Sequence, residues 1–285
     1  GMAVSVIRAR RLIQRIGAGL VLGTGGFVSG PGVMGAALAN RPVVLLEPNA
    51  VPGAATCLLS RWASVAAVAA RSTEEHLRCP VEDTGVPIRA EFATAYRPAD
   101  LDGPMRVLVL GGSQGARQLN ELLPPAIEHL AAARTGLQVT HQVGSGHLEE
   151  ARAAYAQRNL SHVELSLVPF VEDVGEAMSR AQLVISRAGA ITLAEICAVG
   201  RAALLLPLSL AGAHQLGNAR RLVEHGAAEL VEPAQASVEG LTEVLHRLTE
   251  SRDRLREMGE AALRLSRPRA ARDVADLVER VARKA

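Results

Sequence analysis

The sequence predicts an α/β protein built from two doubly wound domains, each around a parallel sheet. Short apolar runs alternate with segments of helical period along most of the chain, which is the pattern of βαβ units. The alternation breaks at residues 96–104, YRPADLDGP, a polar stretch with the proline and glycine content of a linker. We therefore expect a first domain over residues 1–98 and a second over residues 99–285.

The first half opens with a predicted helix from Val4 to Ile16, in which apolar and basic residues are mixed. The runs that follow alternate between strand and helix, in the order GLVLGTGG, GVMGAALAN, PVVLLEP, ATCLLSRWA and VAAVAA. A doubly wound domain usually opens with a strand and its phosphate-binding turn, and that opening is absent here. We expect an incomplete first domain, whose sheet edge would be covered by self-association, by a partner chain or by further segments of a longer protein.

The second half restarts at residue 105 with a buried strand that runs through glycines into a helix. Further strands are expected at 137–142, 163–168, 182–186, 202–207 and 228–232, with helices between them. The rest of the chain has helical periodicity, and SVEGLTEVLHRLTE begins with a capping serine. Pro268 should divide two final helices, because proline cannot continue a helix.

Composition excludes several classes of protein and site. Lys and Arg number 31 against 29 Asp and Glu, which leaves no strong basic field for nucleic acid. Cys57, Cys79 and Cys197 have neither CxxC spacing nor histidine companions, so we expect free thiols, no metal site and no cofactor. No apolar run approaches the roughly 18 residues of a membrane span, and no signal peptide is visible. We expect a cytoplasmic protein.

Residues 183–218 carry the clearest functional signal. They contain two consecutive strand-to-helix turns, which open on the same edge of a parallel sheet, where ligands bind in such folds. The turn SRAGAIT has small residues where a backbone must approach a ligand, and Glu195 follows on the next helix. A carboxylate there can accept hydrogen bonds from the paired hydroxyls of a ribose. This pattern predicts a nucleotide site.

Two glycine-rich turns add to this prediction. Gly111 to Gly115 follow a buried strand and open a helix, so backbone N–H groups and the helix dipole could face a diphosphate. Gly23 to Gly32, GTGGFVSGPG, follow a strand of the first domain and could offer backbone to a second ligand. Neither turn has the GxGxxG or GxxxxGK[ST] spacing, so each is equally well read as a tight turn required by packing.

Several motifs together resemble one enzyme family. The matching segments, in order, are GTGGFVSGPG, LEPNAVPG, GGSQGARQLN, VPFVEDV, SRAGAITLAEI and HQLGNARRLVEHGAA. In sequence and order they are similar to the MurG glycosyltransferases, and the match covers nearly the whole chain. The resemblance implies a GT-B fold and an inverting, metal-independent transfer of GlcNAc from UDP-GlcNAc to lipid I. It also implies a peripheral location on the cytoplasmic face of the inner membrane.

The resemblance implies donor-site residues at matched positions. Ser113 of GGSQGA is similar to the family's diphosphate contact, and Arg89 of VPIRAEF to an arginine suited to phosphate. Phe170 and Val171 match the pair that flanks the uracil.

A second group of implied donor residues comes from the loop and helix start of SRAGAITLAE: Arg187, Ala190, Ile191, Thr192, Leu193, Ala194 and Glu195. Glu195 would hold the ribose hydroxyls, and Gln215 and Asn218 match the polar pair that reads the sugar. Each has an alternative interpretation. Arg187 could be a solvated turn residue, Glu195 an exposed helix carboxylate and Asn218 a helix cap.

The acceptor half departs from the family. Its GGTxGH loop does not occur in this chain, and the family's HEQN segment reads LEPN here. Two aspartate positions are occupied by Gly212 and Ala213. Asn49 remains as a substrate contact, and Glu47 is the remaining candidate for the base that an inverting transfer needs. The alternative function is a non-catalytic or partner-dependent UDP-sugar-binding protein.

The predicted first helix has a possible membrane role. Its apolar residues are interleaved with Arg8, Arg10, Arg11 and Arg15. A basic amphipathic helix can lie on an anionic membrane surface, which would suit a lipid-linked acceptor. An ordinary surface helix packed on the sheet is the alternative.

Overall fold

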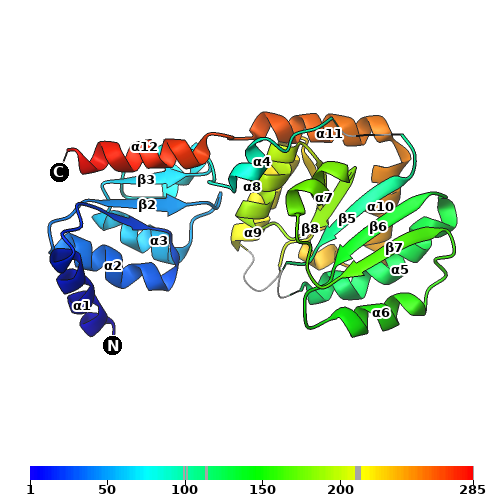
Figure 1. Cartoon of the computed structure of the whole chain (residues 1–285), viewed down its shortest axis with the longest axis horizontal. Helices are drawn as coiled ribbons and strands as arrows, with labels where there is room; N and C mark the ends of the chain where they lie inside the picture. The colour runs from blue at the N-terminus through cyan, green and yellow to red at the C-terminus, as the bar shows by residue number, and fades with distance from the viewer. Residues whose placement is uncertain (99, 101, 113–114, 209–212, 285) are drawn as a thin grey trace. The chain divides into compact units, whose positions relative to one another are not determined.

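The computed structural model describes residues 1–98, 100, 102–112, 115–208 and 213–284. The chain forms two compact units (Figure 1). The first unit comprises Gly1–Ile88 and Arg267–Ala285, and the second comprises Arg89–Ser266. This division differs from the predicted one at residue 98, since the predicted linker lies in the second unit and the C-terminal segment lies in the first.

The first unit is built on four parallel strands in the order β1-β2-β3-β4. The strands are β1 (Val21–Gly23), β2 (Val43–Glu47), β3 (Val65–Val68) and β4 (Val81–Asp83). One face is covered by α1 (Met2–Arg15), α2 (Gly26–Leu38), α3 (Ala54–Leu59) and the 3-10 turn η1 (Ser60–Trp62), while the 3-10 turn η2 (Arg71–His76) precedes β4. Their core on that face comprises Ile13, Val33, Ala36, Val43, Leu45, Leu59, Ala66 and Val68.

The other face of this sheet is covered by a helix from the far end of the chain, α12 (Ala270–Ala282) (Figure 1). Val274 and Leu277 of α12 pack on Val44 and Ala67 of the two central strands. Burial on both faces explains why β2 and β3 read as continuous apolar runs. The expected break at Pro268 is confirmed, since α11 (Arg252–Leu265) ends before it and α12 begins after it.

The turn in the glycine-rich segment of the first unit is shorter than the sequence suggests. Helix α2 begins at Gly26, so only Thr24 and Gly25 lie between β1 and the helix, and most of the glycine-rich segment is helical. Pro31 lies inside the helix. The burial of Val33 and its neighbours against the sheet offsets the hydrogen bond that proline cannot donate.

The first helix is packed on one side and exposed on the other. Val6 and Ile13 are buried, and α1 packs against α2. Its remaining large apolar side chains, with Ile16 just beyond the helix end, are exposed: Met2, Val4, Ile7, Leu12 and Ile16. In the described part of the chain, no helix combines the length and the apolar character that crossing a membrane requires.

The second unit is built on six parallel strands in the order β10-β9-β8-β5-β6-β7. The strands are β5 (Met105–Leu110), β6 (Leu137–Gln142), β7 (Val163–Val168), β8 (Leu183–Ser186), β9 (Ala202–Leu205) and β10 (Ala228–Leu230). The predictions for 137–142 and 163–168 agree with β6 and β7 at both ends. From β5 the chain proceeds outward to β7, then returns to β8 on the other side. That reversal is the topological switch point of a doubly wound sheet.

Helices cover both faces of this sheet (Figure 1). Those on one face are α5 (Arg117–Ala133), α6 (Leu148–Ala156) and α10 (Val238–Glu250). Those associated with the other are α7 (Val174–Arg180), α8 (Ala190–Val199), α11 and the short α4 (Ala90–Ala93). Helix α9 (Ala213–Glu224) packs beside β10, after which the 3-10 turn η3 (Pro233–Gln235) leads to α10. The Ser237 hydroxyl accepts a hydrogen bond from the Gly240 N–H, which confirms the expected cap of α10.

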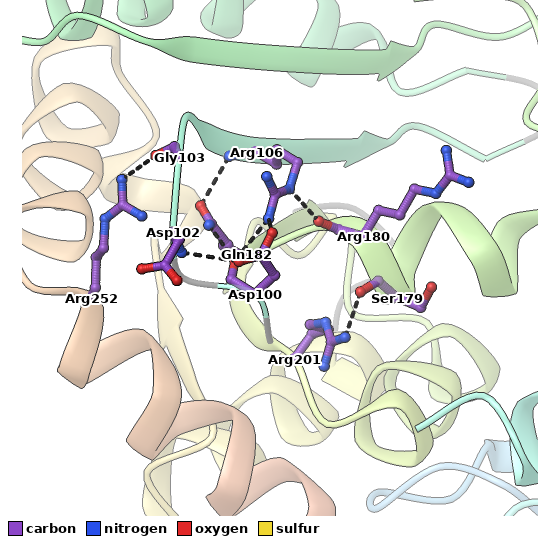
Figure 2. A network of polar contacts seen from close by, with 9 residues as sticks. All are labelled: Asp100, Asp102, Gly103, Arg106, Ser179, Arg180, Gln182, Arg201 and Arg252. Atoms are coloured by element: carbon purple, nitrogen blue, oxygen red, sulfur yellow. Dashed lines mark hydrogen bonds and ion pairs between the residues drawn. The ribbon is translucent and has the colours of Figure 1, made fainter. Parts of the chain in front are cut away.

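The predicted linker is held against the second unit (Figure 2). Arg106 Nη2 donates to a carboxylate oxygen of Asp100 at 2.8 Å, and Gln182 Nε2 donates to the Asp100 carbonyl at 2.6 Å. Arg252 donates to the Gly103 carbonyl at 2.6 Å. These bonds come from β5, from the residue before β8 and from the start of α11, so Asp100 and Gly103 are held against this unit.

Arg201 joins the ends of two helices in the same unit (Figure 2). Its buried guanidinium donates to the carbonyls of Met178 and Ser179 on α7 and to those of Val199 and Gly200 at the end of α8. Burial lowers the pKa of Arg201 to about 10, which keeps the group charged at neutral pH. A cation at two helix C-termini is favourable because both helix dipoles are negative there.

Candidate nucleotide-binding site

A cleft of about 420 Å³ opens in the second unit at the carboxyl ends of β5, β6 and β8. This is the switch point of the sheet, where the ends of neighbouring crossovers diverge and leave room for a ligand. Six residues predicted from the sequence line it: Arg89, Phe170, Arg187, Thr192, Glu195 and Gln215. The structure therefore brings together residues from four separate segments of the chain.

The glycine-rich turn after β5 forms part of the cleft wall. Gly111 and Gly112 line the cleft. A Cβ atom on Gly111 would lie 2.6 Å from the Gln142 carbonyl oxygen, and Gly112 has a φ of +78°, so both positions favour glycine. The turn is thus required by packing and also presents backbone to the cleft. Ser113, predicted as a diphosphate contact, lies outside the described residues.

Arg187 follows β8 and supplies a cation to the cleft. The side chain is half-buried, and burial lowers the pKa of its guanidinium. Among the residues that the structure describes, no carboxylate forms an ion pair with it. A partly desolvated arginine without a protein counter-charge is suited to an anionic ligand such as a diphosphate.

Glu195 lies on α8 and is 8% exposed. Burial raises the pKa of its carboxyl, and the nearby Arg89 opposes that rise. Arg89 Nη2 lies 3.6 Å from Glu195 Oε1, and the same guanidinium contacts Glu91 at 3.0 Å and stacks over Phe92 with its centre 4.9 Å from the ring. No sequence pattern indicates this ion pair, because its partners are far apart in the chain. In this structure Arg89 faces the carboxylate predicted to hold the ribose.

The run at the start of α8 contributes one side chain to the cleft. Thr192 lines it together with the preceding Gly189. Leu193 is buried in the core and Ile191 points to solvent, while Ala190 and Ala194 are partly exposed. The first N–H groups of a helix have no acceptor within the helix, so this end also presents backbone donors and a positive dipole.

Phe170 and Val171 lie beside the end of β6. Phe170 lines the cleft and is 54% exposed, so an apolar ring face is available for a flat ligand group. Val171 is not part of the cleft wall. Its N–H donates to Gln142 Oε1 at 3.1 Å, which fixes this segment to β6.

The two residues predicted to read the sugar have different positions. Gln215 lines the cleft, and its Oε1 accepts a hydrogen bond from the Leu208 N–H at 3.1 Å. Asn218 is buried, and its Nδ2 donates to the Ala188 carbonyl at 3.2 Å. Asn218 thus holds the loop that precedes α8, and any effect on a sugar through this contact is indirect.

Four residues of the cleft were not predicted as site residues: Leu110, Gln142, Val174 and Ser186. A signal for Gln142 and Ser186 was present, because both end predicted strands. Parallel strands place their last residues at one edge, so polar residues there are candidates for ligand contacts.

Glu47 and Asn49 belong to the first unit. Glu47 is 2% exposed, and its two oxygens accept hydrogen bonds from the Asn49 N–H at 3.0 Å, the Asn49 Nδ2 at 2.8 Å and the Gly53 N–H at 3.2 Å. These bonds fix the loop between β2 and α3. Both oxygens of this carboxylate are thus engaged by its own loop.

The three cysteines are free. Burial raises the pKa of each thiol, to about 12 for Cys197, which disfavours the reactive thiolate form. Within the described ranges, no cluster of histidine, cysteine, aspartate or glutamate side chains could hold a metal ion.

Comparison with known proteins identifies the fold and the family. Residues 2–68 match the glycosyltransferase family 28 N-terminal domain, and residues 106–280 match the glycosyltransferase family 28 C-terminal domain. In structure, the chain is similar to MurG from Acinetobacter baumannii, with a TM-score of 0.85 and 33% identity over 96% of this chain and 77% of that one. A UDP-GlcNAc 2-epimerase from Neisseria meningitidis has a TM-score of 0.70 at 14% identity, which shows a shared fold alone.

Two relatives resemble the chain over nearly all of its length. Both are named as UDP-N-acetylglucosamine--N-acetylmuramyl-(pentapeptide) pyrophosphoryl-undecaprenol N-acetylglucosamine transferase. The protein from Paraburkholderia xenovorans is 39% identical over 95% of this chain and 73% of its own length. The protein from Sorangium cellulosum is 41% identical over 95% of this chain and 67% of its own length. With its two parallel-sheet units of GT-B type, the chain belongs to the MurG family of glycosyltransferases.

Proposed function

We propose that this protein transfers GlcNAc from UDP-GlcNAc to the undecaprenyl-diphosphate-linked muramoyl pentapeptide, lipid I, giving lipid II. The observation that carries the proposal is the cleft at the switch point of the second unit, in which Arg187 and Glu195 face one space. Its cation suits a diphosphate and its carboxylate suits ribose hydroxyls. The names of the relatives supply the sugar and the acceptor.

Within this proposal each wall of the cleft has a separate task. The glycine turn after β5, Arg187 and the N-terminus of α8 receive the diphosphate, because all three offer donors or positive charge. Glu195 accepts hydrogen bonds from the ribose, and Phe170 lies against the uracil. Gln215 contacts the sugar.

The reaction needs charge stabilisation on the leaving group and a base for the acceptor. The acceptor hydroxyl attacks the anomeric carbon as the bond to the UDP oxygen breaks, which inverts that carbon. Arg187 and the dipole of α8 would stabilise the negative charge that develops on UDP. Glu47 remains the proposed base that takes the hydroxyl proton, although its three N–H donors favour a structural role.

We further propose a peripheral location on the cytoplasmic face of the membrane, through α1. Its exposed apolar side chains lie beside Arg8, Arg10, Arg11 and Arg15. Sedimentation with anionic and with neutral vesicles tests this, since equal recovery with both would argue against an electrostatic contribution.

Calorimetric titration with UDP-GlcNAc and UDP, followed by a transfer assay with radiolabelled UDP-GlcNAc and lipid I, tests the proposed function. Binding of both nucleotides and formation of labelled lipid II are expected. Absence of binding would reject the assignment of the cleft. Binding without transfer would favour the alternative, a non-catalytic UDP-sugar-binding protein or one that needs self-association or a partner chain.

A further inference from the structure

The carboxylate of Glu195 faces a cation of its own unit at the surface of the cleft. Arg89 and Glu195 both line the cleft, and Arg89 Nη2 lies 3.6 Å from Glu195 Oε1. The packing of α4 against α8 brings them together, because Arg89 directly precedes α4 and Glu195 lies on α8. A cation is therefore placed at the carboxylate that the proposed function gives to the ribose.

The contact between Arg89 and Glu195 is weak. A distance of 3.6 Å is longer than a full hydrogen bond, and the Arg89 side chain is 53% exposed, so water screens the attraction. Burial raises the pKa of the Glu195 carboxyl even with Arg89 nearby, so the arginine does not compensate fully for the desolvation of this group. A ligand that offers better hydrogen bonds can replace such a contact.

Arg89 has other partners that it can keep when it leaves Glu195. Its Nη1 lies 3.0 Å from Glu91 Oε1, and the centre of its guanidinium lies 4.9 Å from the centre of the Phe92 ring. Phe92 is fully buried, so its ring is a fixed platform for the cation. Loss of the contact with Glu195 therefore leaves the guanidinium paired and stacked.

A ribose requires the atoms that Arg89 contacts. Two neighbouring hydroxyls can donate to the two oxygens of one carboxylate, and one of these oxygens in Glu195 faces Arg89 Nη2. The Glu195 side chain is only 10% exposed, so its accessible surface is too small to receive both partners. The guanidinium and the ribose hydroxyls therefore exclude one another at this carboxylate.

We propose that Arg89 competes with the ribose for Glu195, so that a uridine nucleotide must replace this ion pair with its own hydroxyl groups as it binds. Arg89 is thus an autoinhibitory contact that lowers the affinity for a ribonucleotide. A nucleotide without the two hydroxyls leaves the ion pair in place. This inference rests on the proposed function, in that it takes Glu195 to hold the ribose of a uridine nucleotide.

The test uses the ratio of the dissociation constants of 2′,3′-dideoxy-UDP and UDP, measured by calorimetry at pH 8 on the full chain. Both ligands carry the same base and diphosphate, so the ratio isolates the contribution of the ribose hydroxyls. Arg89→Gln removes the competing cation. Arg180→Gln is the matched control, because Arg180 forms an exposed ion pair with Glu176 at 2.7 Å in the same unit and does not line the cleft. Thermal melting verifies that each variant is folded.

The wild type and Arg180→Gln should bind UDP about tenfold more tightly than its dideoxy analogue. In Arg89→Gln this ratio should be about threefold larger, the effect of losing one ion pair of ordinary surface strength. An unchanged ratio would overturn the inference, and an equal loss of both affinities would then make Arg89 a phosphate contact. A smaller ratio would overturn it as well, because Arg89 would then orient Glu195 for the ribose.

Salt provides a second measurement that needs no substitution. Raising the NaCl concentration from about 0.05 M to about 0.5 M weakens an exposed ion pair, whereas its effect on the diphosphate cancels in the ratio. The ratio should therefore rise about twofold in the wild type and stay constant in Arg89→Gln. A wild-type ratio that stays constant or falls would contradict the competition. Failure of the wild type to bind UDP would instead reject the proposed function.

Discussion

Glu47 of the first unit and Glu195 of the second are both nearly buried, with exposures of 2% and 8%, yet their surroundings differ. Glu47 is held by two backbone N–H groups and one side-chain amide. For Glu195, the only ion-pair partner in the described part of the second unit is Arg89 at 3.6 Å, and burial raises the pKa of its carboxyl.

The difference shows that burial of a carboxylate does not by itself mark a functional group. A carboxylate whose oxygens are engaged by its own loop contributes to folding. A carboxylate that is desolvated without full compensation is destabilising for the protein, but it retains lone pairs for the hydroxyls of a ligand. Replacement of Glu47 should therefore lower stability much more than replacement of Glu195.

The largest effect is expected from Glu47→Leu. Three N–H donors lose their acceptor in a buried loop, which should lower the free energy of unfolding of the first unit by about 3 kcal/mol. The fluorescence of Trp62, the one tryptophan of the chain, reports on this unit. Glu74→Leu, at an exposed glutamate in the same unit, is the control. A midpoint of denaturation equal to that of the control would contradict the structural role of Glu47.

Acid should next distinguish the two units, because the second contains a buried neutral histidine. His141 bonds through Nδ1 to the Tyr155 hydroxyl at 3.0 Å, and burial lowers its pKa to about 4. The unfolded chain, with a histidine pKa of 6.5, binds more protons between these values. The neutral ring therefore makes its full contribution to the free energy of unfolding above pH 6.5. As the pH falls from 6.5 toward 4, that free energy should decrease by about 3 kcal/mol.

Near-ultraviolet circular dichroism of the tyrosines measures this loss, since both tyrosines lie in the second unit. His141→Leu removes the titration while keeping an apolar side chain of similar size. An identical decline of stability with acid in the wild type and in His141→Leu would show that other groups cause it.

The smallest effect on folding is expected from Glu195→Gln, which removes a desolvated charge. The free energy of unfolding should stay within about 1 kcal/mol of the wild type and should not fall as in Glu47→Leu. The affinity for UDP should nevertheless fall about tenfold, because an amide replaces one of the charged acceptors for the ribose. If Glu195→Gln lost stability but kept its affinity for UDP, Glu195 would have a structural role like that of Glu47 and the contrast between the two glutamates would be wrong.

The sequence predicted strands well where apolar runs were bounded by clear turn signals. The intervals 137–142 and 163–168 coincide with β6 and β7, and the family motifs led to the cleft residues Arg187 and Glu195. The sheet against which α12 packs could not be predicted from such patterns. Its apolar stripe shows that one face is buried, but helical periodicity carries no information about which sheet covers it.

Two features of the site were also beyond a reading of the sequence. The pairing of Arg89 with Glu195 depends on the packing of α4 against α8, which no local pattern specifies. The attachment of the segment that carries Phe170 depends on a single hydrogen bond from the Val171 N–H to Gln142, which ends a neighbouring strand. Local periodicity in the sequence predicts helices and strands. Hydrogen bonds and ion pairs between residues far apart in the chain form only when those helices and strands pack together.

The position of α12 on the first sheet has a consequence for the order of synthesis. A ribosome releases all of residues 89–266 before the helix that covers Val44 and Ala67. The unit that starts to emerge first is therefore completed last. Until α12 arrives, one apolar face of a nascent sheet stays open to water and to chaperones, while the later unit already has every segment it needs.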